Sequence, residues 1–331
     1  PPTTITPPAA VCPTRPSNVR CIAGPTEVLL SPNNSSDIAR YSANTGEFDG
    51  FFFGGGPAPN FGIGRGHMAT QGPDNCVLYS DSEGEVHIFD SDGSRIPADG
   101  EGNIIQTGAD SLLANSFANA TEYTGFDFYS SDGIIWKLYL TARVDTTGNG
   151  FGDTAQLVRY DYALNGDVVL TNRTVVTEKA GGEFNHVTVR DDLIYLADDS
   201  FDSSTEAQDQ IRVFDVDGNE QTALLVDSAS PRQISNTFDG NLVFADFARE
   251  SIRVVNSAGV TIKNYLLGNN DGTGNDRTRG VYPLRNGNYL VTGFSQINRS
   301  VLDRFDGTLL PAPDGRSTIG VAIGTACLAS D

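Results

Sequence analysis

The sequence predicts an all-β fold built from a repeated sheet unit. Two similar stretches, EVHIFDSDGSR at 85–95 and QIRVFDVDGNE at 210–220, each run through alternating residues into an aromatic residue, an aspartate and a glycine turn. Alternation with a period of two that ends in such a turn is typical of a β-strand followed by a hairpin. At 331 residues, the chain is long enough to bury several copies of the unit.

Six copies of this strand and turn follow one another along the chain. Their key residues are Tyr41, Phe89, Tyr160, Phe214, Val255 and Phe305. A second short apolar strand precedes each copy, and these strands read EVLL, CVLY, IIWKLYL, LIYLAD, NLVFAD and NYLVTG. Most of them follow a turn and a further strand. Inner, middle, outer and edge strands in this order form a propeller blade, so residues 21–331 are predicted to fold as a six-bladed β-propeller.

The two ends of the chain are expected to pair with each other. Blade one has no clear inner strand before EVLL at 27–30, and the C-terminal STIGVAIGTACLAS at 317–330 is strand-like with nothing after it. We expect this last segment to supply the inner strand of blade one. Such pairing closes the propeller and removes an open sheet edge.

The four cysteines predict disulfides and an extracellular or cell-surface location. None belongs to a C-x-x-C pair or lies near a histidine at zinc spacing, so the even count favours an oxidising compartment. Closure by the last strand brings Cys327 near Cys21, which favours a Cys21–Cys327 bridge and leaves Cys12 for Cys76, while three connectivities stay open. The predicted glycosylation sites are Asn33, Asn34, Asn119, Asn172 and Asn298.

The net charge and the composition of residues 1–20 indicate which kinds of partner the chain can have. A net charge of −20 repels nucleic acid, and the absence of an apolar run of about 18 residues argues against a membrane span. Residues 1–20, PPTTITPPAAVCPTRPSNVR, favour an extended polyproline-like conformation. They form either a linker or glycosylated stalk, or an arm that docks on a neighbouring copy and gives head-to-tail self-association.

One loop has the ligand spacing of a calcium site. In VDTTGNGFGDTAQ at 144–156, oxygen ligands are expected at alternate positions, with a glycine for the sharp turn. The candidate ligands are Asp145, Thr147, Asn149, Phe151 through its carbonyl, and Asp153. The spacing resembles the nine-residue calcium loops of integrin α-subunit propellers, whereas Gln156 excludes a complete EF-hand. The sequence predicts a structural Ca²⁺ here; the alternative is a polar hairpin loop.

A second candidate site lies at one mouth of the propeller channel. The inner strands line this channel, and their starts read GRGHM, YTGFD, FNHVT, PRQIS, TRGVY and TIGVA. The ligand-binding candidates in these segments are Arg65, Arg232, Arg279 and Asn185, and the candidate general bases are His67 and His186. A basic cluster on an acidic protein suits an acidic carbohydrate. The alternative is that the arginines pair with nearby acids such as Glu183.

The blades resemble those of six-bladed NHL-type propellers and of their streptogramin-lyase-like and senescence-marker/gluconolactonase relatives. The resemblance is carried by DGNLVFADFARESIRVVNSAG at 239–259 and DIARYSANTGEFDGFFFGGG at 37–56, and it covers the chain from about residue 25 onward. It implies the fold and says little about function.

The gluconolactonase relatives hold a divalent metal at the channel mouth with a Glu, two Asn and an Asp. Here Glu27 and Asn185 match two of these ligands, but Thr124 and Arg232 stand at the other Asn and Asp positions. An arginine in place of a metal-ligating carboxylate argues against that chemistry. We therefore expect an extracellular, non-enzymatic binding or structural subunit of a surface layer, matrix or filament. The alternative is a carbohydrate-active lyase or lactone hydrolase acting at the mouth.

Overall fold

The structure, a computed structural model, is described in segments that cover most of the sheet strands. The described residues are 27–30, 38–53, 66–73, 77–81, 86–89, 95–96, 103–105, 120–133, 135–148, 152–164, 168–200, 209–222, 226–228, 230–267, 278–293, 299–311 and 322–324. The predicted N-terminal arm, all four cysteines, Arg65, and the sequon residues Asn33, Asn34, Asn119 and Asn298 lie outside them.

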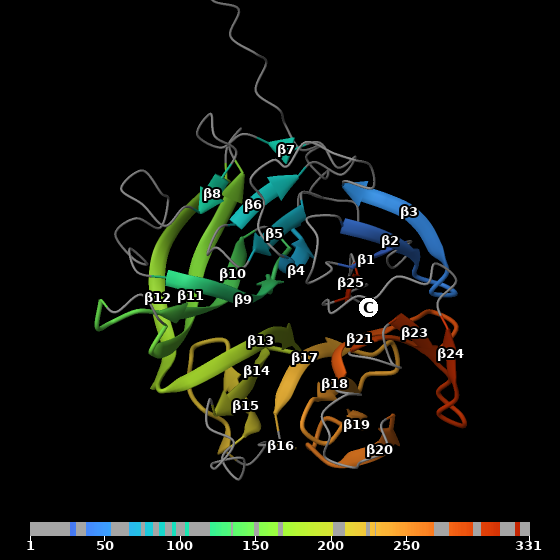
Figure 1. The fold of residues 1–331 in the computed structure, drawn as a ribbon. Helices are drawn as coiled ribbons and strands as arrows, with labels where there is room; N and C mark the ends of the chain where they lie inside the picture. The colour runs from blue at the N-terminus through green and yellow to red at the C-terminus, as the bar shows by residue number, and fades with distance from the viewer. Residues whose placement is uncertain are drawn as a thin grey trace, which may run out of the picture.

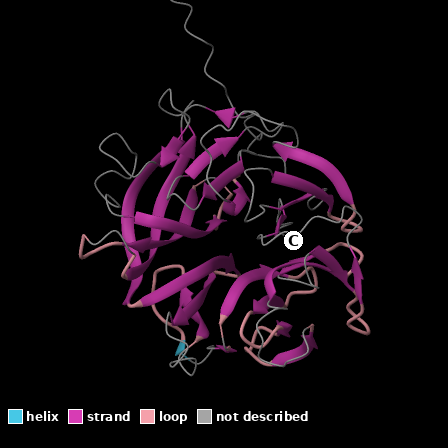
Figure 2. Cartoon of the chain, in the orientation of Figure 1, coloured by secondary structure: helices cyan, strands magenta, loops and turns pink. Residues whose placement is uncertain are grey.

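The described residues form six antiparallel sheets (Figure 1), and Figure 2 shows strands joined by loops. Sheet one contains β25 (Ala322–Gly324), β1 (Glu27–Leu30), β2 (Ile38–Ser42) and β3 (Phe48–Phe53). Sheet two contains β4 (Gly66–Gln71), β5 (Val77–Asp81), β6 (Val86–Phe89) and β7 (Arg95–Ile96), and β8 (Asn103–Ile105) also pairs with β6. Sheet three contains β9 (Ala120–Tyr129), β10 (Trp136–Val144), β11 (Thr154–Leu164) and β12 (Val168–Ala180).

The other three sheets repeat the same strand order. Sheet four contains β13 (Gly182–Arg190), β14 (Leu193–Ser200), β15 (Gln210–Asp215) and β16 (Val226–Asp227). Sheet five contains β17 (Pro231–Asn236), β18 (Leu242–Asp246), β19 (Ser251–Val255) and β20 (Thr261–Leu266). Sheet six contains β21 (Thr278–Pro283), β22 (Tyr289–Gly293), β23 (Arg299–Leu302) and β24 (Leu309–Pro311).

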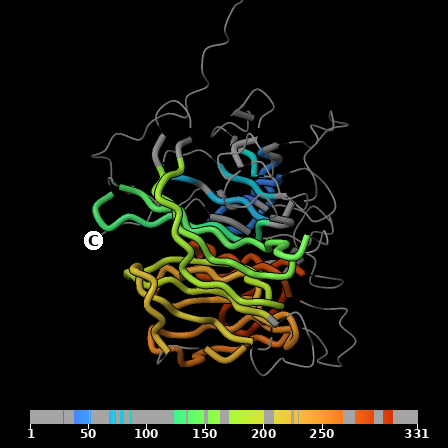
Figure 3. Tube along the Cα trace, turned by 90° about the vertical axis from the view of Figure 1, so that its left-hand side faces the viewer, coloured from blue at the N-terminus to red at the C-terminus, as the bar shows by residue number. Residues whose placement is uncertain are grey.

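The sheets are arranged around a common centre as in a β-propeller. The first strand of each sheet lies nearest the centre in Figure 1, and the last strand lies at the periphery. Each innermost strand contacts the innermost strands of the two neighbouring sheets, in the order β4, β9, β13, β17, β21, β25 and back to β4. The quarter turn in Figure 3 shows the sheets following one another in chain order. Among the described residues no helix has the length and apolar character needed to cross a membrane.

The C-terminal strand pairs with the first strand of the chain, as predicted. In β25, Ile323 lies opposite Leu29 of β1, and the two strands are antiparallel. Sheet one is therefore assembled from both ends of the sequence, which gives β1 a pairing partner on each side.

The predicted repeat is confirmed in its strands and corrected at one residue. Tyr41, Phe89, Tyr160, Phe214 and Val255 lie on the third strands of their sheets. Phe305, by contrast, lies beyond β23 and is 76 % exposed. The equivalent residue in sheet six is Leu302, which is buried and pairs with Tyr289. The turn after β23 places an aromatic residue near its glycine, and this mimicked the repeat in sequence.

The core lies between neighbouring sheets, because each sheet is covered on both faces. In β18, Val243 and Ala245 belong to the apolar cluster shared with sheet six, whereas Leu242 and Phe244 belong to the cluster shared with sheet four. All five residues of β18 are buried. This explains why the middle strands read as continuous apolar runs instead of alternating.

Candidate functional site

A bulge recurs in the innermost strands and brings the mouth residues to one level. In sheets two to six, the register between the first and second strands shifts at the same height. A bulge leaves a residue unpaired and redirects its side chain. The residues at these shifts are His67, Thr124, Asn185, Arg232 with Gln233, and Arg279. Four of the site residues predicted from the sequence therefore occupy equivalent positions in their sheets, namely His67, Asn185, Arg232 and Arg279.

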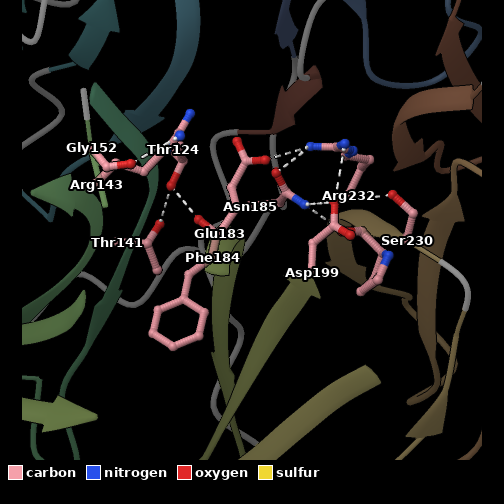
Figure 4. A network of polar contacts seen from close by, with 11 residues as sticks. Thr124, Thr141, Arg143, Gly152, Glu183, Phe184, Asn185, Asp199, Ser230 and Arg232 are labelled. Atoms are coloured by element: carbon pink, nitrogen blue, oxygen red, sulfur yellow. Dashed lines mark hydrogen bonds and ion pairs between the residues drawn. The ribbon is translucent and has the colours of Figure 1, made fainter. Parts of the chain in front are cut away.

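Arg232 is the centre of a polar network between sheets four and five (Figure 4). Its guanidinium donates to Asn185 Oδ1, lies 3.5 Å from Glu183 Oε2 and lies 3.1 Å from Asp199 Oδ2. It also stacks over the Phe247 ring, 4.8 Å from the centroid. The Arg232 side chain is 18 % exposed, so these partners account for most of its surroundings. The alternative that the sequence left open, pairing with local acids, applies to this arginine.

Asn185 joins the same two sheets through its amide. Its Nδ2 donates to Asp199 Oδ2 at 3.0 Å and to the Pro231 carbonyl at 2.9 Å, while its Oδ1 accepts from Arg232. Thr124 has a similar role between sheets three and four, since its hydroxyl contacts Thr141 Oγ1 and donates to the Phe184 carbonyl. The bulged side chains that Figure 4 shows thus bond to one another or to the backbone of the next sheet.

Asp199 has the most perturbed acidity in this network. Burial, opposed by the Arg232 charge, raises its pKa to about 7, and a hydrogen bond with the Asp209 side chain acts in the same direction as burial. Both aspartates are buried. Arg232, Asn185 and Ser230 all donate to Oδ2 of Asp199, at 3.1, 3.0 and 3.0 Å. A hydrogen bond between the Asp199 and Asp209 carboxyl groups requires a proton on one of them. The sequence analysis did not identify this pair. The only signal for it was the aspartates of LADDS at 196–200 and AQDQ at 207–210.

The two candidate general bases do not occupy equivalent positions. His67 lies in β4 at the bulge, whereas His186 lies one residue after the bulge in β13. The His186 side chain is buried, and burial lowers its pKa to about 3. Neither ring nitrogen has a hydrogen-bond partner within the described residues. His186 is therefore a neutral side chain packed inside the protein, and its backbone lies against Gly125 of sheet three.

Arg279 lies at the equivalent bulge in sheet six. Its guanidinium is 5.2 Å from the centroid of the Phe247 ring, which also carries Arg232. Two guanidinium groups therefore share one aromatic ring at the inner ends of sheets five and six. Sequence reasoning placed both arginines at the mouth but did not identify the ring that holds them, because Phe247 follows a middle strand instead of an inner one.

The predicted calcium loop joins β10 to β11, and its described residues form a hydrogen-bonded turn. Asp145 Oδ1 accepts from the backbone N–H of Gly148 at 2.6 Å and of Thr147 at 3.1 Å. Asp153 Oδ1 accepts from the Thr146 hydroxyl at 2.6 Å and from its N–H at 2.9 Å, and these hydrogen bonds, the hydroxyl first, lower the Asp153 pKa. Asn149 and Phe151 lie outside the described residues.

One oxygen of this loop fits a cation. The Oδ2 atom of Asp153 is shielded from solvent and makes no hydrogen bond of normal geometry with a described residue, although the Thr147 hydroxyl also helps to lower the Asp153 pKa. A shielded carboxylate oxygen without a well-placed donor is the arrangement that a hard cation would satisfy. No group of three or more His, Cys, Asp and Glu side chains suited to a metal occurs in the described parts of the chain. A calcium ion here would therefore depend on carbonyl and hydroxyl ligands besides the two aspartates.

Only one of the five sequon asparagines is described. Asn172 lies on β12, the peripheral strand of sheet three, and is exposed. Its Nδ2 donates to Asp161 Oδ2 at 2.7 Å, and its backbone has a positive φ of 54°. The amide that glycosylation would modify is therefore on the surface but engaged in a hydrogen bond.

Comparison with known proteins shows the fold alone. No protein-family model matches the chain, and no curated protein sequence matches it. Among solved structures, a protein of unknown function from Bacteroides caccae is 13 % identical, with a TM-score of 0.56 over 90 % of this chain and 98 % of that one. Structures with lower scores include the WD40 β-propeller domain of Doa1 (11 % identity, TM-score 0.49, 86 % and 78 % covered) and streptogramin B lyase (13 %, 0.47, 86 % and 78 %).

Proposed function

We propose that the chain is a closed six-bladed β-propeller of the NHL-type and streptogramin-lyase-like kind, and that it serves as an extracellular, non-enzymatic subunit of a surface layer, matrix or filament. Copies assemble head to tail through the N-terminal arm at 1–20. Support for six blades comes from the six sheets and the circular contacts of their innermost strands. A propeller closed in this way has few free inner edges, so assembly must use its periphery or an added segment.

The observation that carries a non-catalytic role is the bonding of the mouth residues to one another. Arg232 bonds to Glu183, Asn185 and Asp199, while its buried Nε has no partner within the described residues, and His186 is buried with its pKa lowered to about 3. Side chains bonded across sheets four and five stabilise the contact between those sheets.

Two ligands belong to this proposal. A structural Ca²⁺ at the β10–β11 loop is supported by the solvent-shielded Asp153 Oδ2, which lacks a well-placed donor among the described residues. An acidic carbohydrate is supported by the two guanidinium groups of Arg232 and Arg279 around Phe247, although Arg232 already faces carboxylates. The net charge of −20 suits a secreted protein that stays soluble before it assembles.

Deleting residues 1–11 tests the assembly. This truncation spares all four cysteines and the six sheets. We expect it to leave a folded monomer that no longer assembles, as measured by light scattering and electron microscopy. Assembly that persists unchanged after the deletion would return these residues to the status of a linker.

A second function is favoured by one observation. Asp199 has a pKa of about 7 and lies 3.1 Å from Arg232, a pair that can donate a proton near a bound anion. This is the arrangement a carbohydrate lyase or lactone hydrolase at the mouth would need. Incubation with acidic polysaccharides and lactones, followed by detection of unsaturated or acidic products, tests it with the Asp199→Asn variant as the control.

A further inference from the structure

An apolar surface lies at the periphery of sheet five. Seven large hydrophobic side chains are exposed among the described residues, and three of them lie on or next to β20. We name these three the outer patch: Val260 (57 % exposed), Ile262 (49 %) and Leu266 (59 %). Lys263 lies toward sheet six, where its ammonium is 5.7 Å from the Tyr265 ring centroid and 5.9 Å from that of Phe305 in the turn after β23.

The strand that carries this patch is an open sheet edge. Within the described residues, β20 pairs only with β19. Tyr265 points into the core between sheets five and six, so Leu266 lies on the opposite, exposed face of the strand. Ile262 is the extra residue of a bulge in β20 and is also exposed. Exposed edges are usually protected by proline, by an outward charge or by a bulge. Here β20 has no proline, and its one charged residue, Lys263, is bonded to the Arg304 carbonyl. Its bulge at Ile262 leaves the regular pairing edge at Lys263–Leu266.

The chemistry of this edge selects its partner. Lys263 and Arg304 lie beside it together with Asp303 and Asp306, so its charges are balanced, and Arg304 stacks on Phe305 at 4.6 Å. An extended, β-branched segment that carries no charge fits such an edge. Residues 1–11 of this chain, PPTTITPPAAV, contain no charged side chain, and Thr3–Thr6 form a β-branched run bounded by proline pairs. The prolines limit pairing to about four residues, which β20 can accommodate.

The predicted disulfides set the reach of the arm. With Cys12 bridged to Cys76, about six residues separate Thr6 from this anchor, and an extended chain of that length spans about 20 Å. The second copy must therefore present its β20 close to Cys12. A compact domain of this size has a radius of gyration of about 20 Å. Beyond the uncharged segment, Arg15 and Arg20 are the only charged residues of 1–20, and they would meet a body that is strongly acidic. The arm and the body are therefore complementary in charge.

We propose that β20 accepts Thr3–Thr6 from the arm of a second copy as an added strand, with Ile5 seated against the outer patch. The inference rests on the proposed assembly through the arm and adds the surface that receives it. Each copy then donates one arm and offers one β20, so the contact is heterologous and propagates from copy to copy.

Two complementary defects test the donor and the acceptor separately. The 1–11 deletion keeps β20 and loses the arm, whereas Ile262→Arg/Leu266→Arg keeps the arm and loses the acceptor. Each is expected to be monomeric alone in analytical ultracentrifugation, and a mixture is expected to give a 1:1 heterodimer and nothing longer. The matched control, Ile135→Arg/Phe238→Arg, changes two equally exposed apolar residues elsewhere and should assemble like the wild type.

A peptide of residues 1–11 gives a second measurement on the truncated protein. Fluorescence anisotropy of the labelled peptide should show saturable binding, weakened at least tenfold by the β20 substitutions. If the double arginine variant does not fold, Ile262→Thr/Leu266→Thr replaces it with a milder loss of apolar surface. Two results support the proposal. The truncated protein and the β20 variant form a heterodimer when mixed, and the β20 substitutions weaken binding of the peptide.

The other outcomes separate this inference from the proposed function. If the truncation is monomeric but the β20 variant assembles like the wild type, the arm docks elsewhere and β20 is not the acceptor. If the truncated protein still assembles, both proposals fail. If the peptide binds β20 while the full chain stays monomeric at every concentration, the arm docks on its own body and the second copy is excluded.

Discussion

Replacing Asp199 by Asn should abolish a large part of the dependence of stability on pH between about 4 and 7. In the folded protein the Asp199 carboxyl is buried beside Asp209, and its pKa rises from 3.8 to about 7. A group whose folded pKa lies above its unfolded value stabilises the fold below the unfolded pKa. It loses that contribution as the pH rises through the folded pKa. Wild-type stability from this group is therefore full below about pH 4 and lost above about pH 7.

The magnitude follows from the difference between the two pKa values. At about 1.4 kcal/mol per pH unit, the rise to about 7 corresponds to about 4 kcal/mol, and sharing of the proton with Asp209 reduces what one substitution recovers to about 2–4 kcal/mol. Asn fits the same contacts. Its carbonyl oxygen can accept from Arg232, Asn185 and Ser230, while its amide can donate to Asp209. The variant should therefore be more stable than the wild type at pH 8 and nearly equal to it at pH 4.

Urea unfolding at intervals from pH 4 to pH 8 measures this difference directly. Asp127, whose pKa is raised by burial to about 6, titrates in the same window but is present in both proteins, so it cancels. Asp306→Asn is the control, because a hydrogen bond from the Thr308 hydroxyl lowers the pKa of Asp306 and moves its titration below this range. If the free energy of unfolding changed with pH in the same way for the wild type and Asp199→Asn, the raised pKa of Asp199 and the proton shared with Asp209 would be refuted.

Two further predictions concern the calcium loop and the packing of the sheets. Adding calcium to chelator-treated protein should raise its melting temperature, and Asp145→Ala should remove the rise; an equal response of both proteins would exclude the β10–β11 loop as the site. Gly125→Ala should destabilise the fold by about 1–3 kcal/mol in thermal or urea unfolding, because its methyl group would lie 2.8 Å from Thr141 Oγ1 and 2.9 Å from the His186 Cα. A change in the free energy of unfolding below about 0.5 kcal/mol would show that sheets three and four can move apart enough to accommodate the added methyl group.

The strands and their order could be predicted from sequence because both are local properties. A buried apolar run, an alternating run and a glycine turn are each contained within about ten residues, and their repetition predicts sheets that pack face to face. Even the pairing of the chain ends followed from counting strands, since sheet one lacked a first strand and β25 had no other partner. Phe305 shows the limit of such counting, because the turn after β23 carries an exposed aromatic residue that fits the pattern, whereas the buried residue at the equivalent position is Leu302.

The site required the tertiary structure because its contacts cross from sheet to sheet. The bulges that align Asn185, Arg232 and Arg279 add one residue to a strand, and nothing in the local alternation marks where the addition falls. The same one-residue shift separates His186 from the mouth and buries it. Asp199 meets Arg232 only because β14 and β17 belong to adjacent sheets, and burial there, a property of the packed sheets, sets its pKa. The sequence by itself thus determined which strands form and how many sheets they make, while packing between sheets decided which charges meet and which protons they hold.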